Sequence, residues 1–186
     1  MRTINILRTM AVAGAVLLAP SMMSAQVASK PLSFSLFGGA SMPMGDASNA
    51  FNTGYTFGGS MDLRNSSMLG LRADASYSSN SLKSTVGTGS NKTMGANLDA
   101  VLWTSKSPSP VTPYLVTGAS FAHYDIGNGV PTENHWGFNA GAGLDFAMGR
   151  IPARIDARYT QISTGKDANG NSTSMKTVPL TFGIRF

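Results

Sequence analysis

The sequence has no cysteine and few charged residues of either sign. An exported chain without cysteine cannot rely on disulfides, and it has neither a thiol nucleophile nor a thiolate metal ligand. Charged residues make up 12% of the chain, about half the share of a typical soluble domain. Glutamate occurs only at Glu133, whereas 21 glycines and many serines, threonines and asparagines favour strands and turns. The composition therefore predicts an all-β chain whose low charge has a structural reason.

The sequence also lacks a basic stripe with interleaved aromatic residues, so we expect no nucleic-acid partner. The formal charge of +5 is partly a property of the N-terminus. Arg2 and Arg8 lie there, and the first acidic residue of the chain is Asp46.

Long apolar runs are absent except near the start of the chain. Arg2 and Arg8 precede an apolar run at 10–19, which is followed by small and polar residues up to Ala25. This order is typical of a secretory signal, because the run has about half of the roughly 20 residues that a transmembrane anchor needs. We therefore expect a signal peptide at 1–25 and one domain at 26–186. No later segment could form a membrane-spanning helix, which leaves an exported soluble protein or a barrel.

From Pro31 onward, apolar and polar residues alternate with the period of a β-strand. In one segment, for example, Met94, Leu98 and Leu102 alternate with Asn97 and Asp99. The fifth segment has small or apolar residues on both faces, so its pattern does not orient it. The eight segments lie at 32–41, 55–64, 69–77, 94–103, 111–123, 136–146, 154–160 and 176–186.

The connections between these segments alternate in length. Those at 65–67, 105–110 and 149–152 are short, whereas those at 42–53, 78–92, 124–135 and 162–174 are long. Short periplasmic turns and longer extracellular loops are typical of outer-membrane barrels. We therefore predict an eight-stranded antiparallel up-and-down transmembrane β-barrel in the cell outer membrane, in contact with its lipid.

The charged residues indicate which strand face meets lipid. Every charged residue within the segments, including Lys176, is assigned to the polar face. This assignment predicts a lumen lined by nearly balanced numbers of Arg and Asp. In the alternative, an exported soluble lipocalin-like barrel, the same face would be the solvated outside. Glycines on that face would leave room for the arginines (Gly58, Gly70, Gly95, Gly137, Gly141, Gly143). The predicted lumen network, with a structural role, consists of Asp62, Arg64, Arg72, Asp74, Asp99, Asp145, Arg154, Asp156, Arg158 and Arg185.

Aromatic residues at strand ends also favour the membrane, as an interfacial girdle requires (Tyr55, Tyr77, Trp136, Phe186).

Two parts of the chain resemble a known family. The last strand, with Phe182, Ile184 and Phe186, resembles the C-terminal assembly signal of outer-membrane proteins. Residues 38–46, and 113–115 further along, are similar to the small OmpA/OmpX-like "outer membrane protein beta-barrel" family. The resemblance implies this barrel architecture and recognition of the last strand by the barrel-insertion machinery.

Candidates for chemistry are few. Ser120, His123 and Asp125 could suggest a lipid deacylase, but three residues along a strand place Ser120 and His123 on opposite faces. His123 and His135 would need a third ligand, from Asp125 or Glu133, to hold a metal. We therefore expect no enzyme, no metal site and no cofactor.

Two classes of function remain. The first is a structural or surface-interaction barrel whose extracellular loops bind a ligand, and the polar residues of 78–92 fit this role. The second is a narrow channel or a lipid-modifying enzyme of the outer membrane. A broad pore is not expected, because side chains fill the interior of an eight-stranded barrel.

Overall fold

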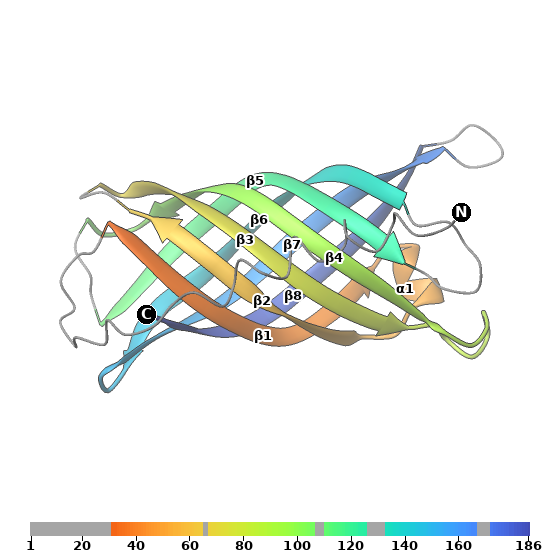
Figure 1. The fold of residues 1–186 in the computed structure, drawn as a ribbon, viewed down its shortest axis with the longest axis horizontal. Coiled ribbons are helices and arrows are strands. Elements are labelled where there is room, and N and C mark those ends of the chain that lie inside the picture. Colours follow the sequence, from red (N-terminus) through yellow and green to blue (C-terminus); the bar gives the residue numbers. More distant parts are fainter. Residues whose placement is uncertain (1–30, 65–66, 107–109, 126–132, 167–171) are drawn as a thin grey trace, which may run out of the picture.

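The computed structural model describes residues 31–64, 67–106, 110–125, 133–166 and 172–186, so the predicted signal peptide at 1–25 lies outside the described residues. The described residues form eight strands and one short helix, α1 (Ala47–Ala50), which follows the first strand (Figure 1). The strands are β1 (Leu32–Met44), β2 (Gly54–Leu63), β3 (Leu69–Ser81), β4 (Ser90–Trp103), β5 (Val111–Asp125), β6 (Glu133–Met148), β7 (Ile151–Lys166) and β8 (Ser172–Arg185).

Each strand pairs antiparallel with the next, and β8 pairs with β1 to close the barrel. The predicted eight-stranded up-and-down topology is therefore confirmed. We call the end with Arg185 and the turn at 149–150 the turn end, and the opposite end, with Met44 and Ser81, the loop end. Among the described residues, no helix is long and apolar enough to cross a membrane.

The two faces of the barrel wall are inverted relative to a soluble protein. On β4, Leu98 is 62% exposed on the outside, whereas the neighbouring Asp99 is 1% exposed in the interior. Water would penalise such an apolar outer surface, whereas lipid favours it. The structure therefore supports the membrane barrel and not the soluble lipocalin-like alternative.

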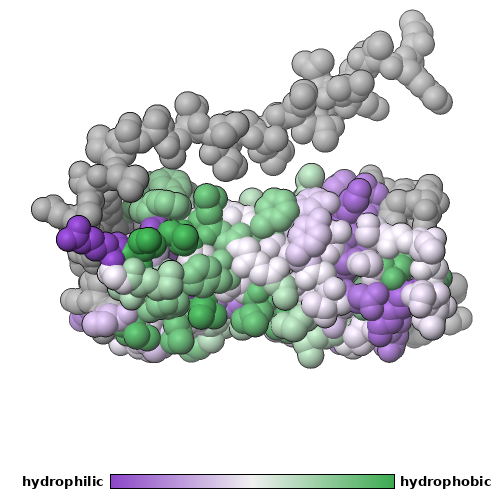
Figure 2. Space-filling view, turned by 90° about the horizontal axis from the view of Figure 1, so that it is seen from below, coloured by the Kyte–Doolittle hydropathy of each residue, from purple (hydrophilic) through white to green (hydrophobic). Residues whose placement is uncertain are grey.

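The hydrophobic surface does not cover the whole barrel. Figure 2 shows hydrophobic residues gathered over the half nearer the turn end, with paler and more hydrophilic residues toward the loop end. The strands nevertheless continue into this hydrophilic part, because strand pairing requires only backbone groups. The connection predicted at 78–92 therefore shrinks to residues 82–89, since β3 runs to Ser81 and β4 starts at Ser90.

The face predicted for Lys176 is wrong, and the structure gives the orientation of the fifth segment, which the sequence pattern left open. Lys176 lies on the outer face, because its neighbours Met175 and Thr177 line the interior. An outward lysine is tolerated there, because Lys176 pairs with Met44 at the loop end, beyond the hydrophobic band. The fifth segment, β5, turns Tyr114 and Ser120 inward, and both are almost fully buried.

Candidate functional site

Strand alternation brings the predicted charged residues together in the interior. Arg154, Asp156 and Arg158 follow one another at every second position of β7, so they share its inner face. Between strands, Asp62 lies opposite Arg72, and Asp145 lies opposite Arg154. The sequence thus pairs opposite charges directly across neighbouring strands.

The network begins at the turn end around Asp145. Its Oδ1 lies 2.8 Å from Nε of Arg154, and its Oδ2 lies 3.1 Å from NH1 of Arg185. Arg154 also reaches Asp62, with 2.9 Å between NH2 and Oδ2. Both aspartates are almost fully buried, so the two ion pairs of Arg154 are shielded from water.

Arg72 continues the network toward the middle of the barrel. Its Nε lies 2.6 Å from Oδ1 of Asp62, and its NH1 lies 3.3 Å from Oδ2 of Asp156. Its guanidinium carbon also lies 4.8 Å from the centre of the Tyr114 ring, in cation–π contact. A single fully buried arginine thus joins β2, β3, β5 and β7.

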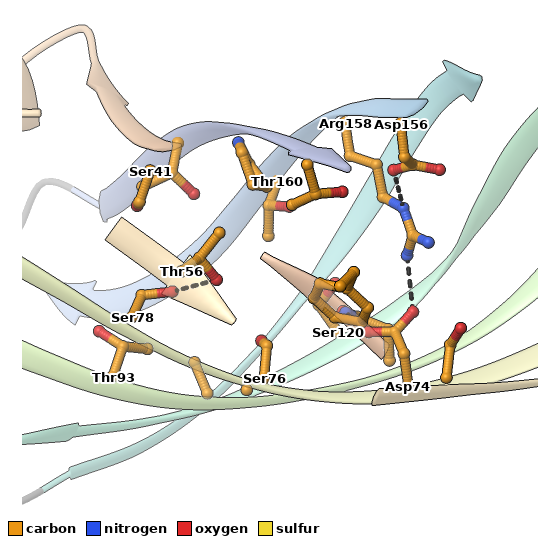
Figure 3. Close-up of a pocket in the computed structure, with 18 of the residues that line it drawn as sticks. Ser41, Thr56, Asp74, Ser76, Ser78, Thr93, Ser120, Asp156, Arg158 and Thr160 are labelled. Atoms are coloured by element: carbon orange, nitrogen blue, oxygen red, sulfur yellow. Dashed lines mark hydrogen bonds and ion pairs between the residues drawn. The ribbon is translucent and has the colours of Figure 1, made fainter. Parts of the chain in front are cut away.

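Arg158 completes the network by contacting three carboxylates. Its NH1 lies 2.8 Å from Oδ2 of both Asp74 and Asp99, and its Nε lies 2.7 Å from Oδ1 of Asp156. The other oxygens of Asp74 and Asp99 accept hydrogen bonds from the side-chain amides of Asn97 and Asn139, at 2.6 and 2.8 Å. Figure 3 shows Arg158 between Asp156 and Asp74.

Arg64 is the exception within the predicted set. It forms no ion pair among the described residues and instead places its guanidinium 4.6 Å from the centre of the Trp103 ring. It also donates a hydrogen bond to the carbonyl of Ser105, just beyond β4. Arg64 therefore anchors the connection between β4 and β5 at the turn end.

Four aromatic residues of the interior were not predicted: Phe37, Trp103, Tyr114 and Tyr124. The Trp103 indole donates to Oδ2 of Asp145 at 3.0 Å, and the Tyr114 hydroxyl donates to Oδ2 of Asp156 at 2.5 Å. Phe37 lines the interior nearer the loop end than Trp103 and Tyr114 do. The signal for Tyr114 was its even spacing from Ser120, since residues six apart on a strand share a face.

The prediction that the inward glycines leave room for arginines holds at Gly141, whereas Gly58, Gly70 and Gly143 make room for these rings. A Cβ atom on Gly143 would lie 2.3 Å from the Tyr114 ring, and one on Gly70 would lie 2.8 Å from the Trp103 ring. Among the six predicted glycines, Gly141 has an arginine side chain, that of Arg158, among its nearest atoms.

Toward the loop end, the interior opens into a cavity of about 110 Å³ whose lining includes many serines and threonines (Figure 3). The Ser78 hydroxyl donates to that of Thr56 at 3.0 Å, and Asp74 and Arg158 form part of the lining. The buried hydroxyls of Ser35 and Ser60 have no hydrogen-bond partner among the described residues. This chamber therefore offers polar groups that a small polar molecule or water would satisfy.

The histidines do not form a site with Ser120. His123 Nδ1 lies 2.8 Å from Oδ1 of Asn134, and His135 Nε2 lies 2.8 Å from Oε2 of Glu133. Ser120 is buried in the interior, where its hydroxyl accepts from Asn139 at 3.0 Å. No cluster of three potential metal ligands occurs among the described residues.

The C-terminal residues predicted as an assembly signal all lie on the outer face: Phe182, Ile184 and Phe186. The Phe186 amide donates to the carbonyl of Phe34 at 2.7 Å, so the last residue is joined to β1. Their role in assembly stays a prediction.

Outward aromatic pairs mark the loop-end limit of the hydrophobic band. The ring centres of Phe121 and Trp136 are 5.0 Å apart, and those of Phe57 and Tyr77 are 5.4 Å apart. Beyond this girdle, the outward side chains are mostly polar. We call this polar part of the wall, which includes Ser79, Ser81, Lys92, Ser163 and Lys176, the outer rim.

Two connections meet at the outer rim. The Lys83 amide donates to the carbonyl of Ala50 at 2.8 Å, and the Asn52 amide donates to that of Ser81 at 2.8 Å. Residues 45–53, which include α1, and residues 82–89 are thereby tied into one surface, which we call the rim platform.

Similar structures come from outer-membrane barrels. Neisserial surface protein A is 18% identical, with a TM-score of 0.59 over 84% of this chain and 96% of that one. Ail of Yersinia pestis, solved with the heparin analogue sucrose octasulfate, is 19% identical, with a TM-score of 0.51 over 83% and 97%. The outer membrane enzyme PagL is 17% identical, with a TM-score of 0.52 over 82% and 98%.

No curated protein sequence matches the chain. A family model does, however: the outer membrane protein beta-barrel domain matches residues 12–186, nearly the whole sequence. The closed barrel, its apolar outer face and this match agree. The chain therefore belongs to the outer membrane protein beta-barrel family and resides in the outer membrane.

Proposed function

We propose that the protein is a surface-interaction barrel, in which the outer rim and the rim platform bind an extracellular ligand and the interior has a structural role. The observation that carries the proposal is the buried ion-pair network across the interior. Arg72 is 0% exposed and Asp99 is 1% exposed. An ion passing through would have to separate these pairs in a low-dielectric interior, which is costly.

The rim platform supports the proposal because it is ordered by backbone hydrogen bonds and exposed to solvent. An ordered surface loses less conformational entropy on binding than a mobile loop does. Ail, a barrel of the same fold, has been solved with a heparin analogue. A second barrel of this fold is Neisserial surface protein A. An extracellular ligand for this chain is consistent with those relatives.

The proposal includes the absence of enzymatic activity. A serine hydrolase needs the histidine within hydrogen-bonding reach of the serine hydroxyl. Ser120 is instead buried in the interior, whereas His123 contacts Asn134 near the outer rim. In the two principal alternatives the function depends on other residues. A narrow channel would conduct through the interior, and a lipid-modifying enzyme would use the histidines for catalysis.

The experiment removes half of the rim platform. Residues 82–89 are replaced by an Asn-Gly turn, which can join β3 and β4 directly. Cells that display the protein are tested for binding to immobilised extracellular-matrix proteins and to sucrose octasulfate. We expect the shortened variant to insert normally and to lose binding.

The matched control replaces Gly149 and Arg150 at the turn end with the same Asn-Gly turn and should keep binding. Binding that survives loss of residues 82–89 would contradict the proposal. So would lipid hydrolysis that His123→Ala abolishes.

A further inference from the structure

The outer surface has a groove near the turn end that the proposed function does not use. The groove measures about 350 Å³ and lies across β5, β6 and β7. Ala142 and Ala157 in its lining are cross-strand partners, and Leu144 and Ile155 are the next outward pair toward the turn end. Small side chains between larger ones thus leave an apolar depression in a surface that faces lipid. The lining also includes Pro113 and Leu115.

Cations lie beside this groove at the turn end. Thr104 lines the groove, and the exposed Lys106 follows it by two residues. Arg150, also exposed, lies in the turn that leads into β7 and precedes Ile155 by five residues, about 16 Å of extended chain. This distance places Arg150 at the turn end, while Ile155 and the groove it lines lie deeper in the hydrocarbon.

The connection that carries Lys106 is held in place. The Thr104 amide donates to the carbonyl of Pro113 at 3.0 Å, and the Ala147 amide donates to that of Pro110 at 3.2 Å. Ser105, next to Lys106, accepts the hydrogen bond from Arg64. The cation therefore stands on an anchored segment beside β5 and β6.

Charge is also distributed unequally between the two ends of the barrel. The connections at 64–68, 104–110 and 149–150 contain Arg64, Lys106 and Arg150 and no acidic residue. At the loop end, the connections contain Asp46 and Asp167 besides Lys83. The turn end of an outer-membrane barrel is periplasmic. Its exposed charge therefore attracts anionic headgroups in the periplasmic leaflet.

We propose that this groove binds an acyl chain of an anionic glycerophospholipid, whose phosphate pairs with Lys106 and Arg150. The apolar groove accounts for the acyl chain, and the two cations account for the headgroup charge. The site is independent of the extracellular ligand, because it lies at the opposite end of the barrel from the rim platform.

The test measures lipid retention on the refolded barrel by native mass spectrometry, after incubation with equal amounts of phosphatidylglycerol and phosphatidylcholine. The wild type should retain phosphatidylglycerol preferentially. Lys106→Gln with Arg150→Gln should reduce that preference by about fivefold for each cation. The matched control, Lys83→Gln with Lys176→Gln, removes the same charge at the loop end and should leave the preference unchanged.

A second pair of variants tests the groove itself. Ala142→Phe should fill it and reduce retention of both lipids, whereas Ala96→Phe, on the outer face of β4, should not. Heat-modifiable gel migration verifies folding, and Ala157→Leu replaces Ala142→Phe if that variant does not fold. Equal retention of the two lipids by the wild type would overturn the proposal. So would equal loss of preference in both double variants, or full retention in a folded variant with a filled groove.

Discussion

Replacing Arg158 with methionine tests whether the interior network stabilises the barrel. Asp156 would keep its contacts with Arg72 and Tyr114. Asp74 and Asp99 would each lose their ion pair and keep, among the described residues, only amide donors. Removing one partner of a buried ion pair costs about 3–5 kcal/mol. We expect the free energy of unfolding to fall by an amount in this range, because Arg158 is the single cation that pairs with both Asp74 and Asp99.

Urea-dependent unfolding of the barrel refolded into phospholipid vesicles measures this loss, with Lys176→Met, which removes a cation from the outer face, as the control. Combining Arg158→Met with Asp74→Asn and Asp99→Asn should recover much of the stability, because no uncompensated buried charge remains. A stability of Arg158→Met within about 1 kcal/mol of the wild type would refute the reasoning, since that is the cost expected of an exposed pair.

Three further predictions concern the wall. Leu98→Arg should cost about 2–4 kcal/mol in vesicles, because it places a charge in lipid, whereas Asn97→Arg should cost less; equal effects would contradict the assigned faces. Gly143→Ala should cost about 1–3 kcal/mol by overpacking a buried ring, whereas Gly59→Ala, whose Cβ would find its nearest atom at 3.5 Å, should be neutral in the same unfolding assay. Deleting Phe186 should leave unfolded protein in the periplasm, and normal insertion by cell fractionation would disprove its role in assembly.

The strand faces that sequence predicted correctly share a strong contrast between their two sides. On β4 and β6, apolar residues such as Leu98 and Phe138 alternate with Asp99 and Asn139, because lipid and a polar lumen impose opposite requirements. The same contrast identified the charged residues of the network before their partners were known. Ion-pair partners depend on strand register, which alternation alone does not give.

The features that sequence did not predict lie where this contrast fails. Tyr114 is inward although aromatic residues are also typical of the girdle, and its role depends on the space beside Gly143. Lys176 was assigned inward because it is polar, but beyond the hydrophobic band a polar residue can occupy either face. The lengths of the connections were overestimated for the same reason, since the polar strand ends of β3 and β4 pair without an apolar face.

Single-channel recording in planar bilayers tests the central claim most directly, because the account assigns the interior a structural role and places ligand binding at the outer rim. The refolded wild-type barrel should give no steady conductance, since the ion pairs of Arg72 and Arg158 cross the interior. A steady conductance that disappears when Arg72 or Arg158 is neutralised would contradict the account and place the function in the interior.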